Sequence, residues 1–180
     1  MRTEIRLAGF GGQGIILAGH LIGKAAALYD GRFASMSQSY GPEARGGACA
    51  AEVVISDDPI DYPLVEKPDI LVLMSREAAN KYGEDASASR FILIDDGLVH
   101  LDAGVTAHGI PATRLAEKLG NKIAANVVMV GFLIAVTGAI SRDAAEQALR
   151  STVRARTLDL NLRALAAGCG AFDRIAEAVR

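Results

Sequence analysis

The sequence predicts a single α/β domain in which a mainly parallel sheet is flanked by helices and followed by a helical C-terminal part. Three observations support this fold class. Hydrophobic residues make up 51% of the 180 residues and aromatic residues only 5%, so Ala, Val, Ile and Leu must form most of the core. Such a core suits a parallel sheet covered by helices. Apolar runs of strand length recur up to residue 108, and only helical patterns follow residue 124.

The first strand leads into a glycine-rich turn, and an apolar helix follows this turn. We expect the strand over residues 5–8 and the helix over residues 15–28. Between them, a G-x-G-x-x-G spacing with one extra glycine is formed by Gly9, Phe10, Gly11, Gly12, Gln13 and Gly14. Glycines let the backbone approach a ligand closely, and a helix N-terminus offers free N–H groups and a positive dipole end. This order makes the predicted sheet Rossmann-like and favours a phosphate or diphosphate contact over a tight turn without a ligand.

The second strand lacks the acidic residue that a nicotinamide-binding fold would need. We expect this strand over residues 32–38. An acidic residue at its end would bind the ribose hydroxyls of NAD. Here Ser39 follows Gln38, and Asp30 lies before the strand. The sequence therefore argues against a nicotinamide-dependent dehydrogenase.

A second unusual loop follows this strand. It consists of Ser39, Tyr40, Gly41, Pro42, Glu43, Ala44, Arg45, Gly46 and Gly47. The Gly-Pro pair fixes a turn, and the Gly-Gly pair frees the backbone directly after the arginine. The planar guanidinium of Arg45 matches a phosphate or carboxylate with two parallel hydrogen bonds. The alternative is a surface loop in which Arg45 pairs with Glu43 or with a neighbouring acid.

The remaining elements follow in the order expected of this fold class. Further strands are expected over residues 48–55, 70–74, 91–94 and 105–108. One short helix begins after its cap Ser75 and ends near Gly83, and another lies between Pro111 and Gly120. The C-terminal helices are expected over residues 124–137, 141–151 and 154–167, with a final short helix after Gly170.

Three polar residues stand at the ends of apolar elements. Asp95 and Asp96 follow a strand at its carboxyl end, where open α/β sheets bind ligands. Because no second strong carboxylate or histidine lies at catalytic spacing, we interpret them as a solvated strand end. Asn126 lies at the head of the most apolar helix, and we interpret it as a cap or as a buried partner of a backbone group.

The composition argues against several classes of protein. A net charge of -2 gives no indication of nucleic-acid binding. The apolar stretch over residues 127–140 is shorter than the roughly 20 residues that span a bilayer, so we expect a buried helix and no membrane contact. Two cysteines, Cys49 and Cys169, exclude a disulfide framework and cannot by themselves ligate an iron–sulfur cluster. Because the N-terminus has no signal-peptide pattern, we expect a cytoplasmic protein.

Together, the two loops resemble those of the gamma subunit of the 2-oxoacid:ferredoxin oxidoreductases. The likeness extends over essentially the whole chain and includes Pro68-Asp69-Ile70-Leu71-Val72-Leu73 and Ala125-Asn126-Val127 with Gly131. Within that family the chain resembles the 2-oxoglutarate branch, also called 2-oxoglutarate synthase. The resemblance implies one pyruvate/ketoisovalerate oxidoreductase catalytic-type (gamma) domain over residues 1–180.

The resemblance implies a heteromeric enzyme that converts a 2-oxoacid and coenzyme A into acyl-coenzyme A and carbon dioxide and reduces ferredoxin. Alpha and beta subunits would hold thiamine diphosphate and Mg, and the iron–sulfur clusters would lie on the beta subunit or on a ferredoxin-like delta subunit. This chain has neither a cysteine quartet nor the acidic-glycine motif that binds thiamine diphosphate and magnesium. We therefore expect no catalytic residue and no metal ligand in it, and no activity from it alone.

For this subunit, the resemblance implies a role in binding or covering coenzyme A beside the active site. Two loops suited to anion binding at the carboxyl edge of one sheet fit that role. The expected contacts are Gly9, Gly11, Gly12, Gln13, Gly14, Ser39, Tyr40, Gly41, Glu43, Arg45, Gly46 and Gly47. Three alternatives stay open: a non-catalytic scaffold of the same complex, a subunit of an indolepyruvate oxidoreductase, and an NAD(P)-binding oxidoreductase.

Overall fold

The structure, a computed structural model, describes residues 1–40, 47–102 and 104–178, in which six strands form one sheet in the order β2-β3-β1-β4-β5-β6. Their bounds are β1 Arg2–Phe10, β2 Phe33–Tyr40, β3 Ala48–Ser56, β4 Ile70–Leu73, β5 Phe91–Asp95 and β6 His108–Ile110. Strand β3 runs antiparallel to both of its neighbours, β1 and β2, whereas the other pairings are parallel. The predicted mainly parallel sheet is thus confirmed, with β3 as the strand that runs in the opposite direction.

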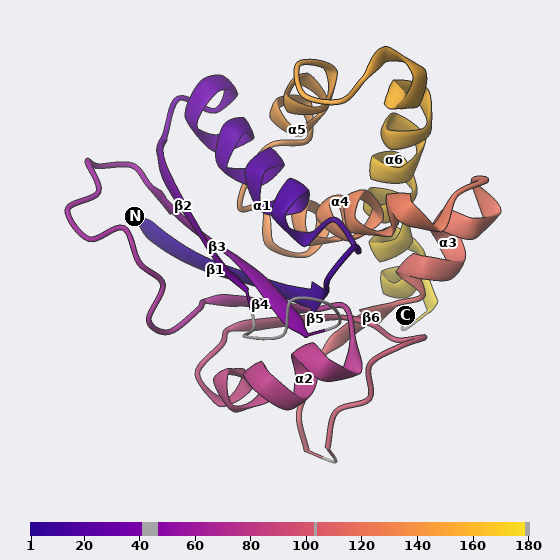
Figure 1. Ribbon diagram of the computed structural model, residues 1–180, viewed down its shortest axis with the longest axis horizontal. Helices are drawn as coiled ribbons and strands as arrows, with labels where there is room; N and C mark the ends of the chain where they lie inside the picture. The colour runs from indigo at the N-terminus through magenta and orange to yellow at the C-terminus, as the bar shows by residue number, and fades with distance from the viewer. Residues whose placement is uncertain (41–46, 103, 179–180) are drawn as a thin grey trace.

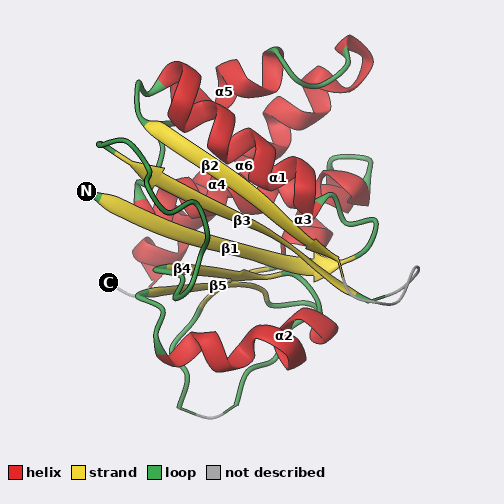
Figure 2. Cartoon of the chain, turned by 60° about the vertical axis from the view of Figure 1, so that its left-hand side comes forward, coloured by secondary structure: helices red, strands yellow, loops and turns green. Residues whose placement is uncertain are grey.

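The helices cover the two faces of this sheet unequally. They are α1 Ile15–Lys24, α2 Arg76–Tyr82, α3 Ala112–Lys118, α4 Ala125–Thr137, α5 Arg142–Arg150 and α6 Ala155–Ala178, with shorter helical turns η1 Ala25–Tyr29, η2 Gly83–Ser87 and η3 Lys122–Ala124. Helices α1, α4, α5 and α6 lie on one side of the sheet, and α2 lies on the other (Figure 1, Figure 2). None of the described helices combines the length and the apolar character that crossing a bilayer requires.

The main core lies between the sheet and the thick helical layer. In β1, Ile5 and Leu7 point into this core, whereas Ala8 belongs to a smaller cluster under α2. Strands covered on both faces must be apolar on both sides, which the short buried runs provide. Helix α4 lies within the layer, and its residues 125–133 are all buried. That position explains why α4 is apolar all round rather than on one stripe.

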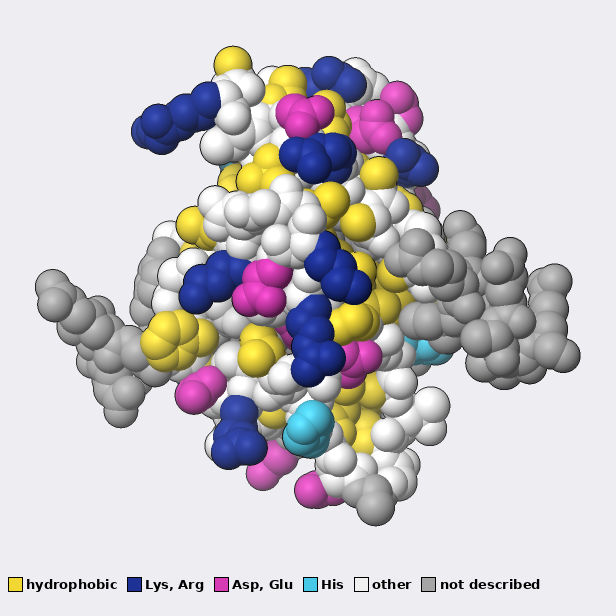
Figure 3. Space-filling model, turned by 90° about the vertical axis from the view of Figure 1, so that its right-hand side faces the viewer, with side chains coloured by type: hydrophobic (Ala, Val, Ile, Leu, Met, Phe, Trp, Pro, Cys, Tyr) yellow, Lys and Arg dark blue, Asp and Glu magenta, His cyan; other side chains and the backbone are white. Residues whose placement is uncertain are grey.

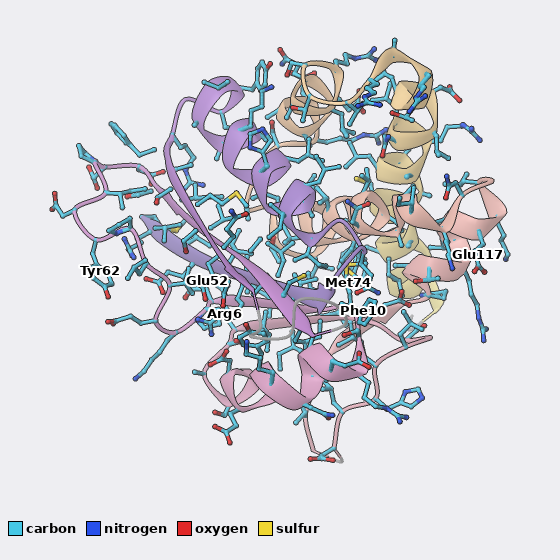
Figure 4. All side chains as sticks on the ribbon, viewed as in Figure 1. Arg6, Phe10, Glu52, Tyr62, Met74 and Glu117 are labelled. Carbon is cyan, nitrogen blue, oxygen red and sulfur yellow. The ribbon has the colours of Figure 1, made fainter. Side chains whose placement is uncertain are left out.

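One partly buried ion cluster supports the sheet on the α2 side. The Arg6 guanidinium lies 2.8 Å from a Glu52 carboxylate oxygen and also pairs with Asp85 of η2. Figure 4 labels Arg6 and Glu52, which lie side by side on neighbouring strands. Burial would lower the pKa of Arg6, but hydrogen bonds and charge from Asp85 and Glu52 raise it above its usual value. The guanidinium is therefore a fixed cation that joins β1, β3 and η2.

Strand β3 brings the ends of β1 and β2 to the same edge of the sheet. Phe10, the last residue of β1, pairs with Ala48 at the start of β3. Tyr40, the last residue of β2, pairs with Cys49. The parallel strands β4, β5 and β6 end at this edge as well. We call it the carboxyl edge, and both loops singled out in the sequence begin there.

The last helix differs from the sequence prediction. A helix over residues 154–167 and a separate short helix were expected, but α6 continues from Ala155 to Ala178 through Gly168 and Gly170. Gly168 is a packing residue, because a Cβ atom there would lie 1.9 Å from the carbonyl oxygen of Val128 in α4. Gly131 of α4 meets α6 in the same way, with Leu165 O 2.2 Å from its ideal Cβ position. The glycines thus bring two helix backbones together and do not end a helix.

Further elements differ in extent from their prediction, and β1 covers Arg2–Phe10 rather than residues 5–8. Strand β6 is His108–Ile110 rather than residues 105–108, because it pairs only with the last part of β5, from Leu93 to Asp95. The helix expected over residues 15–28 ends at Lys24, and a π-helical turn over Ala25–Tyr29 follows. The N–H of Asp30 closes this turn on the carbonyl of Ala25 at 3.0 Å.

Strand β2 forms one outer edge of the sheet. It pairs with β3 without interruption from Phe33 opposite Ser56 to Tyr40 opposite Cys49, and none of its eight residues is charged. Two hollows that share His20 and Met36 lie between β2 and the helical segment formed by α1 and η1. Their lining residues are Ile16, Leu17, His20, Gly23, Lys24, Leu28, Ala34, Ser35, Met36, Ser37 and Gln38. Their lining is mostly apolar.

Candidate functional site

The glycine turn joins β1 to α1 at the carboxyl edge, and its shape depends on glycine at particular positions. Gly14 has a φ of +76°, in the left-handed region that favours glycine. Gly9 is required for a different reason, because a Cβ there would lie 2.6 Å from both Gln13 Oε1 and Ile15 Cδ1. The turn itself is closed by the N–H of Gln13, which donates to the carbonyl of Phe10 at 3.1 Å.

The side chain of Gln13 holds the turn to the sheet. Its Oε1 accepts a hydrogen bond from the N–H of Phe10 at 2.6 Å, and its Nε2 donates to the carbonyl of Met74 at 2.9 Å. Figure 4 shows Phe10 and Met74 next to each other beside the end of β1. The amide thereby links the ends of β1 and β4. Gln13 was predicted to contact a ligand, and the structure uses its side chain to shape the turn.

Asn126 of α4 holds the turn from the other side. It is 2% exposed, and its Nδ2 donates to the carbonyl oxygen of Gly14 at 2.9 Å. The interpretation of Asn126 as a buried partner of a backbone group is confirmed. Which group it binds, 112 residues earlier in the chain, was not evident from any local pattern.

The turn and the start of α1 present a row of free backbone N–H groups. The first N–H of the helix to reach an acceptor is that of Ala18, which bonds Gly14 O at 3.0 Å. Within the described residues, no acceptor is found for the N–H groups of Gly11, Gly12, Gly14, Ile15, Ile16 and Leu17. Gly11 and Gly12 are exposed. Free N–H groups at the positive end of a helix dipole are suited to an anionic group such as a phosphate.

The second loop begins and ends beside this turn. Tyr40 is the last residue of β2 and Gly47 precedes β3, whose first residue, Ala48, pairs with Phe10. The predicted contacts Gly41, Glu43, Arg45 and Gly46 lie outside the described residues, as does the side chain of Tyr40. Ser39 is half-buried in β2. The structure thus brings the stems of the second loop to the glycine turn, as the sequence predicted for two loops at one edge.

Comparison with known proteins assigns the family. The model of the family described as pyruvate ferredoxin/flavodoxin oxidoreductase matches residues 4–171. This chain belongs to that family. Among relatives, the 2-oxoglutarate synthase subunit KorC of Methanocaldococcus jannaschii is 51% identical over 173 residues, which are 93% of this chain and 92% of that subunit. The family assignment therefore covers nearly the whole chain, including the glycine turn and α4.

Solved structures of the family share the fold. The gamma subunit of a keto/oxoacid ferredoxin oxidoreductase from Geobacter sulfurreducens superposes with a TM-score of 0.83 at 40% identity and covers 93% of this chain and 94% of its own. The 2-oxoglutarate:ferredoxin oxidoreductase of Magnetococcus marinus, solved with 2-oxoglutarate, coenzyme A and succinyl-CoA bound, gives a TM-score of 0.85 over 94% of this chain and 30% of its own. At 23% identity, this second likeness concerns the fold.

Asp95, at the carboxyl end of β5, is structural in this family member. The expectation of a solvated strand end is wrong for Asp95, which is 0% exposed. Its Oδ2 accepts hydrogen bonds from the Thr113 N–H at 2.9 Å and the Thr113 hydroxyl at 2.6 Å, because the first turn of α3 packs against the strand end. Asp96 is exposed. Desolvation and the neighbouring Asp95 charge raise the pKa of Asp96, against the opposing effects of Arg114 and His100.

The described residues offer no metal-binding cluster. No group of three or more His, Cys, Asp or Glu side chains among them could hold a metal ion. Neither cysteine forms a disulfide within the described residues; Cys49 is buried in β3 and Cys169 is half-buried in α6. Burial raises the pKa of the Cys49 thiol, which keeps it protonated and unreactive. Among the described residues, the candidate site therefore offers backbone N–H groups and no set of metal-ligating side chains.

Proposed function

We propose that this chain is the gamma-type subunit of a 2-oxoglutarate:ferredoxin oxidoreductase. The complex converts 2-oxoglutarate and coenzyme A into succinyl-coenzyme A and carbon dioxide and transfers the electrons to ferredoxin. The observation that carries this proposal is the 51% identity to a 2-oxoglutarate synthase subunit over almost the full length of both chains. Identity at this level over nearly the full length of both chains indicates that this chain occupies the same position in the same kind of complex.

The chemistry is divided between this chain and its partners. Thiamine diphosphate, Mg and the iron–sulfur clusters belong to alpha and beta subunits, with a ferredoxin-like delta subunit as a further possible carrier of clusters. Support comes from the two cysteines of this chain, too few for a cluster, and from the lack of a metal-binding group among the described residues. Two cysteines that form no disulfide within the described residues also suit a reducing compartment, and we assign the complex to the cytoplasm.

The contribution of this chain is a contact with coenzyme A at the carboxyl edge. The free N–H groups of the glycine turn and of the start of α1 would bind one phosphate group of the coenzyme, with Arg45 supplying a guanidinium to the same group. The residues proposed to form this contact are Gly9, Gly11, Gly12, Gln13, Gly14, Ser39, Tyr40, Gly41, Glu43, Arg45, Gly46 and Gly47. Support comes from the geometry of the turn and from the adjoining stems of the second loop.

Substitution of Arg45 tests this contact in the assembled enzyme. Arg45→Ala removes a charge-assisted hydrogen bond of about 1.5–3 kcal/mol, so the coenzyme A KM should rise roughly ten- to hundredfold. Arg45→Lys should restore only part of the loss, because lysine keeps the charge but not the planar fork. Decarboxylation precedes the thiol step, so single-turnover release of carbon dioxide without coenzyme A should stay at the wild-type rate.

Arg142→Ala provides the matched control, since Arg142 is an exposed arginine on α5 whose ion pair with Glu146 lies within its own helix. It should leave the coenzyme A KM unchanged. An unchanged KM in Arg45→Ala would show that Arg45 is no ligand. Loss of subunit assembly in Arg45→Ala would instead assign the second loop to a subunit interface and favour the scaffold role.

A further inference from the structure

We propose that Asn126 is a positioning residue for the coenzyme site: together with Gln13, it fixes the glycine turn so that the free N–H groups face the carboxyl edge. The inference rests on the proposed function for its ligand, but its geometry is a property of this chain alone. Asn126 does not touch the open side of the turn. It acts through the carbonyl of Gly14.

Asn126 binds one particular backbone group, the carbonyl of Gly14. Gly14 is the residue that precedes α1, and its carbonyl accepts two hydrogen bonds, from Asn126 Nδ2 at 2.9 Å and from the Ala18 N–H at 3.0 Å. A trans peptide unit is planar, so its C=O and N–H point in opposite directions. With Gly14 O held toward α4 and the helix, the Ile15 N–H of the same peptide unit must point away from them, toward the carboxyl edge.

The environment of Asn126 shows that hydrophobic packing does not explain an amide side chain at this position. It is the single polar side chain among residues 125–133 of α4, all of which are buried. An amide buried without a partner costs about 1–3 kcal/mol, whereas an apolar side chain carries no such desolvation penalty. The bond to Gly14 O satisfies the amide. The close contact also restricts the partner, because a Cβ at Gly14 would lie 2.5 Å from Asn126 Nδ2.

Gln13 provides a second, independent attachment of the same turn. Its side chain joins Phe10 N–H at the end of β1 to Met74 O at the end of β4. The turn is thus held to the sheet by one amide and to α4 by the other. One attachment is at Gln13 and the other at the carbonyl of Gly14, and together they define the orientation of the peptide units around Gly14. Pre-oriented donors lose less entropy when they bind a ligand, which is how such residues act on affinity.

The test uses the assembled enzyme with Asn126→Asp and Asn126→Leu. Both replacements approximate the size of the native side chain and remove the amide donor. At pH 8 we expect each to raise the coenzyme A KM about tenfold, while kcat at saturating coenzyme A and coenzyme-free decarboxylation stay within about twofold of wild type. A positioning role in binding predicts this split between KM and kcat. A parallel fall in kcat and in decarboxylation would overturn the inference.

The pH dependence separates the two variants. A buried carboxyl group has a raised pKa and, once protonated, its O–H can donate to Gly14 O as the amide does. On lowering the pH from 8 to 6, the KM of Asn126→Asp relative to wild type should therefore fall back at least about threefold. The ratio for Asn126→Leu should not move. Equal pH profiles for the two variants would contradict the role of a donor at this position.

A measurement without coenzyme A tests the attachment of the glycine turn independently of the proposed function. In the coenzyme-free complex, hydrogen exchange at the Gln13 and Ala18 amides should accelerate about tenfold in Asn126→Leu, because both amides donate within the turn. Thr137→Val, which removes a hydroxyl bonded to Leu133 O at the other end of α4, is the matched control and should leave the turn unchanged. Unchanged exchange in Asn126→Leu would refute the positioning role. Faster exchange with an unchanged KM would uphold the attachment and refute coenzyme contact at this turn.

Discussion

Gly14 is the residue at which the constraints on the turn converge. Its φ of +76° is unfavourable for other residues, and a side chain there would collide with Asn126. Its carbonyl carries both the first hydrogen bond of α1 and the bond to α4. Gly11, three residues earlier, has open space around it and no positive φ. The two glycines therefore differ in what they contribute, although a motif treats them alike.

We expect Gly14→Ala to lower the free energy of unfolding by about 2–3 kcal/mol, from left-handed backbone strain and from the clash with Asn126. Chemical denaturation of the isolated chain measures this difference. Gly11→Ala is the matched control and should change stability by no more than about 0.5 kcal/mol. Equal losses in the two variants would mean that the contact with Asn126 has no role in stability.

The sequence was least informative about the hydrogen-bond partners of individual side chains. The glycine motif consists of neighbouring residues, so the sequence alone was enough to indicate an anion-binding turn. Met74, one of the two partners of the Gln13 side chain, lies 61 residues away, and Gly14 lies 112 residues from Asn126, so no local pattern identifies these contacts. Asp95 was misjudged for the same reason, since its partner Thr113 lies on a helix that packs against the strand end only in the folded chain.

At the scale of elements, the contact between α4 and α6 depends on two glycines that face each other's helix. Gly131 and Gly168 allow the two backbones to approach so closely that no side chain fits at either position. Because α4 also carries Asn126, this contact places the helix that holds the glycine turn. Gly170, two residues further along α6, has nothing near its ideal Cβ position.

Gly168→Ala should destabilise the chain by about 3 kcal/mol, because a methyl group there would overlap Val128 O and force the helices apart. Gly170→Ala in the same helix should instead raise stability by up to about 1 kcal/mol through helix propensity. Thermal or urea unfolding of the two variants distinguishes these opposite signs. A stabilised Gly168→Ala variant would show that the helices do not meet as closely as the structure indicates.

Apolar runs were sufficient to predict most elements, whereas their ends depended on contacts. Strands β1 to β5 and helices α2 to α5 lie close to their expected positions because short and long apolar runs differ in period and length. The break expected near Gly168 is absent, because a glycine in a helical pattern can serve either a turn or a close packing contact. Only the position of α4 decides between the two.

At the scale of the whole molecule, the proposed site occupies one edge of the sheet and the thick helical layer lies behind it. The face formed by α3 and α6 shows Lys and Arg side chains interspersed with Asp and Glu (Figure 3). On this face, the described side chains thus form no patch of a single charge sign. Function at this scale is expected to depend on other chains.

The purified chain alone should therefore not reduce methyl viologen when supplied with 2-oxoglutarate and coenzyme A. Its two cysteines cannot form a cluster, and its described residues hold no metal-binding group. Activity should appear once alpha and beta subunits are added, and the same mixture without this chain is the control. Viologen reduction by the isolated chain would contradict the proposed division of chemistry.

The uncharged outer strand β2 has a consequence for handling the chain by itself. Edge strands in monomeric proteins commonly carry lysine, proline or a bulge that discourages pairing with other chains. Strand β2 has none of these along its eight residues, and its pairing with β3 is regular throughout. The sequence and regular pairing of β2 therefore offer none of these defences against the approach of another strand. An uncharged and regular edge of this kind favours pairing between copies of the isolated chain.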